Sequence, residues 1–211
     1  MNPADYPHAV LLLVSAPSGA GKTTLCQRLL ADEPSLRYSV SCTTRPPRPG
    51  EKHGEHYFFM ERADFDREAA SGTFLEHAEV HGHGYGTRAD FVERAMEQGH
   101  SVLLDVDVQG ARKIRDVLAA RPADDPLRSR FVDVFLSAPS VTDLRQRLQT
   151  RGQDAIEVIE RRMANAQREM ADAGRYAYQI INGDVEAAYL AFRSIFVASR
   201  HRTRGGLAPS P

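Results

Sequence analysis

A short glycine-rich segment near the amino terminus carries the residue types that bind phosphate. Ala16 to Thr23 reads APSGAGKT, which matches the pattern G-x-x-x-x-G-K-[ST] except at its first position. Gly19 and Gly21 let backbone N–H groups converge on phosphate oxygens, and Lys22 adds a movable positive charge. The Thr23 hydroxyl is a candidate ligand for Mg²⁺. The spacing predicts a phosphate site; the alternative is a strand-to-helix turn that happens to contain Gly-Lys-Thr.

A second segment has the composition of an anion-binding loop. Residues 41–57 read SCTTRPPRPGEKHGEHY, with almost no apolar side chain to build a core. The guanidinium groups of Arg45 and Arg48 match phosphate oxygens bidentately. Three prolines in the same segment limit backbone freedom and so lower the entropic cost of binding. The alternative for such an arginine-rich stretch is a solvated charged loop.

Two carboxylates stand at the end of an apolar run. Asp105 and Asp107 close the segment SVLLDVD, which predicts a buried strand. Ligands collect at the carboxyl ends of strands in doubly wound sheets, and an unpaired buried carboxylate is costly. Holding Mg²⁺ is therefore the role expected of Asp105. Capping of the following turn is the alternative for either aspartate taken singly.

The elements that must position these residues alternate between apolar runs and amphipathic helical patterns. Continuous apolar runs are typical of central parallel strands that are covered on both faces. Capping boxes open two of the helices, at Ser140 with Asp143 and at Asp154 with Glu157. The alternation predicts an α/β fold, a three-layer α/β/α core around a parallel sheet. The predicted strands are 9–15, 101–107, 131–137 and 178–182, and the predicted helices are 23–31, 111–120, 141–149, 154–173 and 185–200.

Residues 37–87 break this alternation. Short alternating runs at 38–42, 56–59 and 74–80 are separated by turn-rich segments, which predicts a small, mostly antiparallel inserted lobe. The tail 203–211 is rich in glycine, proline and serine, and we expect it to be disordered.

Bulk composition narrows the choice of partners. The 211 residues include 27 basic and 28 acidic side chains, a formal net charge of −1, which argues against nucleic acid as the main partner. Cys26 and Cys42 have no disulfide or zinc spacing and predict buried thiols in a reducing compartment. The apolar run 9–14 is too short for a signal peptide or a membrane span. We therefore expect a cytoplasmic protein with small charged ligands and no membrane partner.

Several motifs in this order resemble guanylate kinase. They are SAPSGAGK, TTRPPR, Tyr57, FLEHA at 74–78 and YGT at 85–87, and the likeness runs from about residue 9 to 200. The resemblance implies phosphorylation of GMP, and of dGMP, by ATP with Mg²⁺ to recycle purine nucleotides. It also implies one domain with core segments 9–36, 88–145 and 166–200, a GMP-binding lobe 37–87 and a helical lid 146–165. The implied ATP-binding residues are Ala16, Pro17, Ser18, Gly19, Ala20, Gly21, Lys22, Thr23, Thr24 and Asn182.

The same resemblance assigns the acceptor site. A fixed carboxylate at Glu76 accepts from the ring N–H and amino group of guanine but faces a lone pair on adenine, so the site rejects adenine. Hydroxyl groups at Ser41 and Thr87 are expected to donate to the guanine carbonyl. The implied GMP-binding residues are Ser41, Arg45, Arg48, Tyr57, Glu76, Tyr85, Thr87 and Asp107, and the implied metal ligands are Thr23 and Asp105.

The segments RLQTRG at 147–152 and IERRM at 159–163 resemble the lid of that family. Arg147, Arg151 and Arg162 fall on its arginine positions, where such groups stabilise the transferring phosphoryl charge. Together with Lys22 and Arg45 they form the expected catalytic set. Arg161 is interpreted as a solvent-facing neighbour.

Two other functions stay open on the sequence alone. One is a non-catalytic guanylate-kinase-like binding module, although the complete loop at 16–23 argues against it. The other is a kinase of the same fold with a different acceptor, against which Glu76 and Ser41 argue. The histidines at 77, 81 and 83 are interpreted as a turn before Tyr85 rather than a metal site. The sequence leaves the choice between monomer and homo-oligomer undecided.

Overall fold

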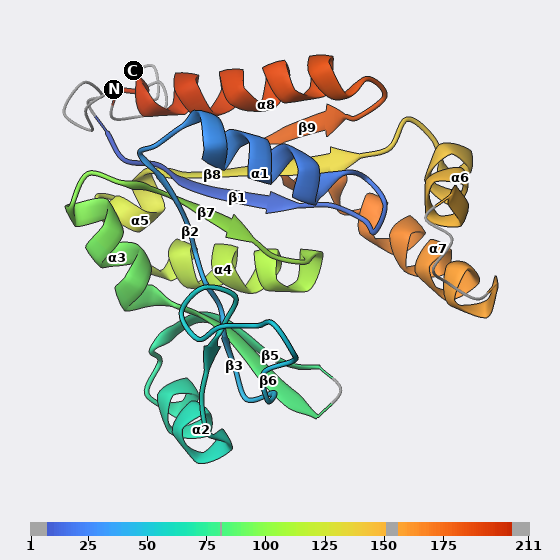
Figure 1. Cartoon of the computed structure of the whole chain (residues 1–211). Helices are drawn as coiled ribbons and strands as arrows, with labels where there is room; N and C mark the ends of the chain where they lie inside the picture. Colours follow the sequence, from blue (N-terminus) through green and yellow to red (C-terminus); the bar gives the residue numbers. More distant parts are fainter. Residues whose placement is uncertain (1–7, 81, 151–155, 204–211) are drawn as a thin grey trace.

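The computed structural model describes residues 8–80, 82–150 and 156–203. Its central element is a five-stranded parallel sheet in the order β2-β7-β1-β8-β9 (Figure 1). This parallel core confirms the predicted α/β class. The strands are β1 (Leu11–Ser15), β2 (Leu36–Tyr38), β7 (Ser101–Asp105), β8 (Phe131–Ser137) and β9 (Tyr178–Ile181).

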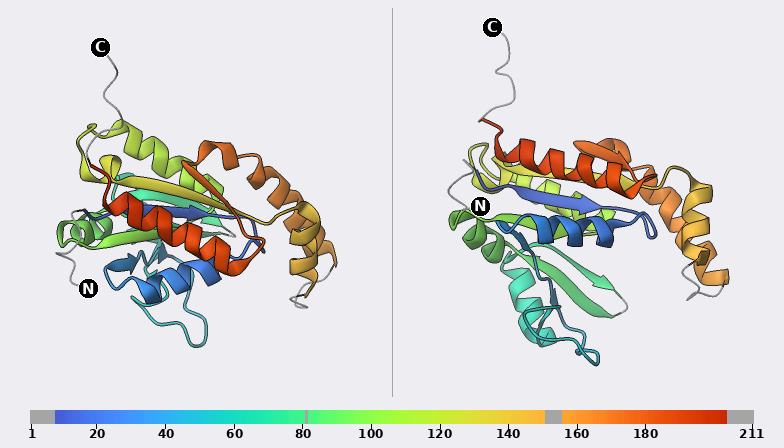
Figure 2. Two further views of the ribbon diagram at one scale, coloured as in Figure 1. Left: turned by 90° about the horizontal axis from the view of Figure 1, so that it is seen from above. Right: turned by 45° about the horizontal axis from the view of Figure 1, so that its top comes forward.

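Helices cover both faces of the sheet because alternate side chains of each buried strand point to opposite sides. Leu12 and Val14 of β1 pack toward α1 (Lys22–Asp32) and α8 (Val185–Arg200). Leu11 and Leu13 pack on the other side, toward α3 (Ala89–Glu97), α4 (Val108–Ala120) and α5 (Pro126–Ser129). Figure 2 shows α1 and α8 lying together over one face. The result is a three-layer core with its interior on both sides of β1.

The inserted lobe projects from one side of this core (Figure 1). Its four-stranded sheet has the order β4-β3-β6-β5, in which β3–β4 is parallel and the other two pairings are antiparallel. The bounds are β3 (Cys42–Thr43), β4 (Phe58–Phe59), β5 (Phe74–Val80) and β6 (His83–Arg88), with α2 (Arg62–Ala70) packed against them. Cys42, Phe65 and Phe74 form a small core of its own.

The described part of the predicted lid, 146–165, lies on two helices, α6 (Val141–Thr150) and α7 (Ile156–Met170), beyond the carboxyl ends of β1 and β8 (Figure 1). Leu144 and Leu148 pack against Ile159 and Met163 in a separate apolar cluster. Met163 is 3% exposed, so it fills a core position. Half of the predicted capping box forms at Ser140: its Oγ accepts a 3.0 Å hydrogen bond from the Asp143 N–H, while the Asp143 carboxylate accepts from the Ser140 hydroxyl. A short 3₁₀ turn, Ala173–Arg175, joins the lid to β9.

The structure differs from the sequence prediction chiefly between residues 36 and 97. Leu36–Tyr38 joins the core sheet beside β7 instead of the lobe. The sequence analysis also missed α2, α3 and α5. The second predicted cap, at Asp154, and the tail from residue 204 lie outside the described residues. No helix in the described part of the chain is both long and apolar enough to span a bilayer.

Candidate active site

The glycine-rich segment forms a tight turn between β1 and α1. Gly19 and Gly21 have φ angles of 93° and 94°, a backbone conformation that residues with a Cβ adopt only under strain. The Ala20 N–H donates to the Pro17 carbonyl at 3.1 Å, which closes the turn. Since α1 begins at Lys22, the unpaired N–H groups of its first turn face the same place. Strand, turn and helix therefore have the arrangement that the phosphate interpretation requires.

Lys22 and Asp105 meet at the end of the turn. The Lys22 ammonium forms a salt bridge with Asp105 Oδ1, and Nζ also donates to the Val106 carbonyl at 3.3 Å. Both side chains stay about one-fifth exposed, 22% and 21%. The bridge joins the first turn of α1 to the carboxyl end of β7, which lies next to β1. A mobile cation and a carboxylate thus stand together where the loop would hold phosphate.

Asn182 connects the loop to the lid. The side-chain Nδ2 of Asn182 donates to the Ala20 carbonyl at 2.8 Å, and the backbone carbonyl of Asn182 accepts from Arg147 Nη2 at 2.7 Å. A Cβ at Gly21 would overlap this amide, which explains why glycine is needed there. A cleft of about 520 Å³ lies beside these groups. Its lining residues are Gly19, Gly21, Thr24, Asp143, Gln146, Arg147, Thr150, Asn182 and Val185.

A second cavity, of about 240 Å³, lies between the core sheet and the inserted lobe. It brings together five of the predicted acceptor residues and the predicted metal ligand Asp105. The centroids of the Tyr57 and Tyr85 rings are 6.0 Å apart on its wall. The cavity is lined by Tyr38, Ser41, His56, Tyr57, Glu76, Ala78, Val80, Tyr85, Asp105, Val106, Asp107 and Gly110. We call it the acceptor cavity.

Glu76 is held in the acceptor cavity by its neighbour on β6. Thr87 Oγ1 donates to Glu76 Oε1 at 2.9 Å, and Thr87 is 1% exposed. Burial raises the pKa of Glu76, the Thr87 hydrogen bond lowers it, and Asp107 raises it. Asp107 caps α4 by accepting from the Gly110 N–H at 2.7 Å, so the capping alternative holds for this aspartate. The hydroxyl proton of Thr87 orients the carboxylate in this structure.

The arginine loop is organised by an acid that the sequence analysis did not single out. Glu51 Oε1 pairs with Arg45 Nη2 at 2.8 Å, and Glu51 Oε2 accepts from the Arg48 N–H at 2.7 Å. These two hydrogen bonds lower the pKa of Glu51 to about 2. The Arg45 guanidinium lies 5.4 Å from the ring centroid of Tyr57, which lines the acceptor cavity. The available signal was the position of Glu51, the first of two glutamates in residues 41–57, three positions after Arg48.

The predicted lid arginines have different positions. Arg147 lies on α6 and reaches Asn182, whereas Arg162 is half-buried on α7. Arg161 is exposed, in keeping with its expected solvent-facing position. Arg151 lies outside the described residues.

The histidine segment gives no sign of a metal centre. His77 lies on β5 with its ring edge-on to Phe65, centroids 6.2 Å apart, and His81 is not described. Within residues 8–80, 82–150 and 156–203, no three His, Cys, Asp or Glu side chains come close enough to hold a metal ion.

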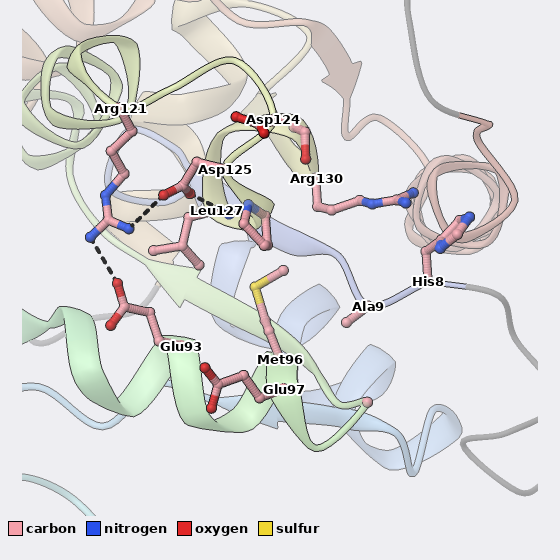
Figure 3. Close-up of a pocket in the computed structure, with 13 residues that line it drawn as sticks. His8, Ala9, Glu93, Met96, Glu97, Arg121, Asp124, Asp125, Leu127 and Arg130 are labelled. Carbon is pink, nitrogen blue, oxygen red and sulfur yellow. Dashed lines mark hydrogen bonds and ion pairs between the residues drawn. The ribbon is translucent and has the colours of Figure 1, made fainter.

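Another cavity, of about 510 Å³, lies at the opposite edge of the sheet (Figure 3). His8, Gly99 and Arg130 come from segments that precede β1, β7 and β8, so this is the amino-terminal edge. The charge on its wall is largely paired internally: Arg121 bonds Glu93 at 2.8 Å and Asp125 at 3.1 Å (Figure 3). The residues suited to phosphate chemistry are at the carboxyl edge.

This fold and site define a nucleotide-binding α/β protein with two pockets near its phosphate-type turn. The family model described as guanylate kinase matches residues 8–199. A guanylate kinase of Alkalilimnicola ehrlichii is 45% identical over 192 residues, covering 91% of this chain and 90% of that protein. One from Gluconobacter oxydans is 46% identical over 195 residues, covering 92% and 89%.

A solved structure agrees with these relatives. The crystal structure of guanylate kinase from Anaplasma phagocytophilum has a TM-score of 0.69 at 32% identity and covers 95% of this chain and 92% of that chain. The chain therefore belongs to the guanylate kinase family, and it is a kinase.

Proposed function

We propose that the chain transfers the γ-phosphoryl group of ATP to the phosphate of GMP, giving ADP and GDP. One observation carries most of the weight: a single cavity is lined both by Glu76 and by Asp105, the salt-bridge partner of Lys22. A nucleotide in this cavity can place its base at the buried carboxylate and its phosphate toward the glycine-rich turn.

On the donor side, the turn and the start of α1 would hold the triphosphate. Backbone N–H groups and the Lys22 ammonium supply positive charge, and the cleft beside Asn182 has room for the adenine. The proposed ATP-binding residues are Ala16, Pro17, Ser18, Gly19, Ala20, Gly21, Lys22, Thr23, Thr24 and Asn182.

On the acceptor side, recognition would divide between base and phosphate. The Glu76 carboxylate accepts from the guanine ring N–H and amino group, Thr87 orients it, and Ser41 donates to the guanine carbonyl. Adenine would leave these buried groups unpaired, which costs a factor of ~10⁴ or more in sites of this kind. Arg45, Arg48, Tyr57 and Tyr85 would hold the phosphate.

The residues present also fit a magnesium ion. Mg²⁺ takes oxygen ligands, usually few from the protein and the rest from water and phosphate. The Thr23 hydroxyl is exposed at the start of α1, and the Asp105 carboxylate lies beside the same turn, bound to Lys22. When bound, Mg²⁺ neutralises charge on the phosphate oxygens of ATP.

Catalysis would rest on positioning and charge neutralisation. An oxygen of the GMP phosphate attacks the γ-phosphorus in line while the bond to the β,γ-bridging oxygen breaks and its electron pair leaves with ADP. The attacking oxygen is already anionic near neutral pH, so no side chain has to remove a proton. Lys22 and the lid arginines, Arg147 and Arg162 with Arg151, would stabilise the spread charge of the transferring group.

The first experiment replaces Lys22 with Ala and measures ADP release with GMP as acceptor. We expect the rate to fall by about two to three orders of magnitude, the usual cost of removing one group that stabilises transition-state charge. The control is Lys52→Ala, because the Lys52 side chain is 70% exposed and pairs only with the exposed Glu55. An unchanged rate in Lys22→Ala would reject the phosphate turn as the donor site.

A substrate panel with GMP, dGMP, AMP and UMP then tests the acceptor. GMP should be the best substrate and AMP poor, because only guanine offers two donors to Glu76. Faster turnover of AMP or UMP than of GMP would contradict the assignment of Glu76.

A further inference from the structure

Tyr38 lies in the acceptor cavity without a role in the function proposed above. It ends β2, where it pairs with Leu103 of β7. Residues that pair across two neighbouring parallel strands point to the same face of the sheet, and so do residues two positions apart in one strand. Tyr38 therefore shares a face with Leu103 and Asp105. The packing of Leu36 and Leu103 in the cluster around α1 identifies that face. The ring of Tyr38 is therefore on the α1 side, where Lys22 bonds Asp105.

The neighbours of Tyr38 place it on the Asp105 side of the cavity, because the charge of Asp105 acts on Tyr38 whereas the charge of Asp107 acts on Glu76. The wall includes Tyr38, Tyr57 and Asp105, whereas Glu76 lies beside the α4 turn, with Oε2 3.6 Å from where a Cβ of Gly110 would be. The Tyr38 side chain keeps 39% of its surface exposed. In the part of the chain that the structure describes, nothing forms a hydrogen bond with its hydroxyl.

We propose that Tyr38 is a third tyrosine of the acceptor-phosphate site, whose hydroxyl donates a hydrogen bond to a phosphate oxygen of GMP on the Asp105 side of the cavity. The inference rests on the proposed function, because it needs GMP to bind with its phosphate toward Asp105. A phenol suits this place because it is a neutral donor with a rigid ring, so it adds no charge beside the Lys22–Asp105 bridge.

The titration of the phenol agrees with this role. Burial, followed by the nearby negative charge of Asp105, raises the pKa of Tyr38 to about 12. The hydroxyl thus keeps its proton across the working pH range. A tyrosinate, which would repel a phosphate, does not form there.

The test is Tyr38→Phe in the full chain, with GMP binding measured by calorimetry and turnover measured by ADP release. We expect KM and Kd for GMP to rise about 10-fold, the usual loss for one hydrogen bond to a charged group. KM for ATP and the thermal midpoint should not change, because the ring stays in place. Tyr178→Phe is the matched control, since Tyr178 is 43% exposed on β9 and belongs to neither wall.

Two results would overturn the inference: an unchanged affinity for GMP in Tyr38→Phe, or a loss confined to kcat and KM for ATP. The second result would mean that the Tyr38 hydroxyl interacts with ATP and not with GMP. A parent chain that binds GMP without phosphorylating it would reject the proposed reaction instead, and the calorimetric comparison would still decide the role of Tyr38.

Discussion

Glu76 illustrates how one side chain depends on its immediate neighbours. Its carboxylate is buried, which raises its pKa and favours the protonated form, yet recognition of guanine needs the ionised form. Thr87 opposes the shift by donating a hydrogen bond to Oε1 at 2.9 Å. The sequence predicted both residues, but it gave no sign that Thr87 contacts Glu76, because that contact requires β5 and β6 to pair in this register.

This pairing leads to a prediction about pH dependence. Only the ionised Glu76 accepts from guanine, so kcat/KM for GMP should rise as pH rises through the pKa of the free enzyme. Thr87→Val keeps the shape but removes the donor, which raises the pKa of Glu76 further. We therefore expect the acid limb of the pH profile of kcat/KM to move to higher pH in Thr87→Val. Initial rates should be measured between about pH 4.5 and pH 8, the range set by the reference pKa values of carboxyl and phosphate groups.

The second ionisation of the GMP phosphate falls in the same pH range, but it affects the parent and Thr87→Val equally. The difference between the pH profiles of the two enzymes therefore reports on Glu76. Asp116→Asn serves as the control, because Asp116 is an exposed carboxylate of α4 that lines neither pocket. Coincident acid limbs in the parent and Thr87→Val would show that Thr87 does not set the ionisation of Glu76.

At the level of elements, the turn between β1 and α1 combines backbone conformation with packing. Gly21 has a φ of 94° and its Cα faces the Asn182 amide, so an added methyl meets both strain and overlap. Gly72, after α2, has a φ of 73° but nothing within 4 Å of an added Cβ. Alanine substitutions at the two glycines therefore separate the free-energy cost of the left-handed backbone conformation from the cost of steric overlap.

We predict that Gly72→Ala lowers the free energy of unfolding by about 1–2 kcal/mol, the cost of a left-handed conformation alone. Gly21→Ala should lower it by more and also raise KM for ATP strongly, because displacement of Asn182 disturbs the donor cleft. Denaturant unfolding and initial rates measure the two effects. Equal stability of the two variants, with normal KM for ATP, would contradict the contact between Gly21 and Asn182.

The elements also show why some parts of the fold were predictable. The helix at 185–200 was predicted with the bounds that α8 has, since Asp184 caps it and Ala188 and Phe192 mark its buried face. Arg37 and Tyr38 were placed in the lobe, whose predicted bounds are 37–87, because a strand of three residues carries no periodic signal. The membership of this strand in the core sheet depends on pairing with residues 101–103, far away in the chain.

The helix α2 was missed for a related reason. Residues 37–87 were interpreted as strands and turns, and α2 buries only Phe65 among polar residues. Its helical pattern was therefore weak without the lobe sheet on which it packs. For the site, residue types predicted the phosphate turn and Asp105, and the resemblance to guanylate kinase predicted the acceptor residues. The Glu51 bridge and the Tyr38 position became visible only with the loop and sheet in place.

For the whole molecule, the arrangement of core, lobe and lid leaves the two substrate pockets apart. The donor cleft and the acceptor cavity share no lining residue among those described. Two arginines of the proposed site are also engaged within the protein: Arg45 with Glu51, and Arg147 with the Asn182 carbonyl. In-line transfer requires the reacting atoms to approach to about 3–3.5 Å. The lobe and the lid must therefore move toward the core when both substrates bind.

This requirement predicts that the molecule contracts fully only when both pockets are filled. Size-exclusion-coupled X-ray scattering, which also reports the oligomeric state, should show a smaller radius of gyration than the ~17 Å expected for a compact chain of this length when GMP and a non-hydrolysable ATP analogue are both present. GMP alone should give a smaller change, since it fills only the cavity between the core and the lobe and leaves the donor cleft empty. Replacing GMP with AMP should abolish the full contraction, because adenine cannot satisfy Glu76. An unchanged radius with both ligands bound would mean that transfer occurs without closure, which the separation of the pockets does not allow.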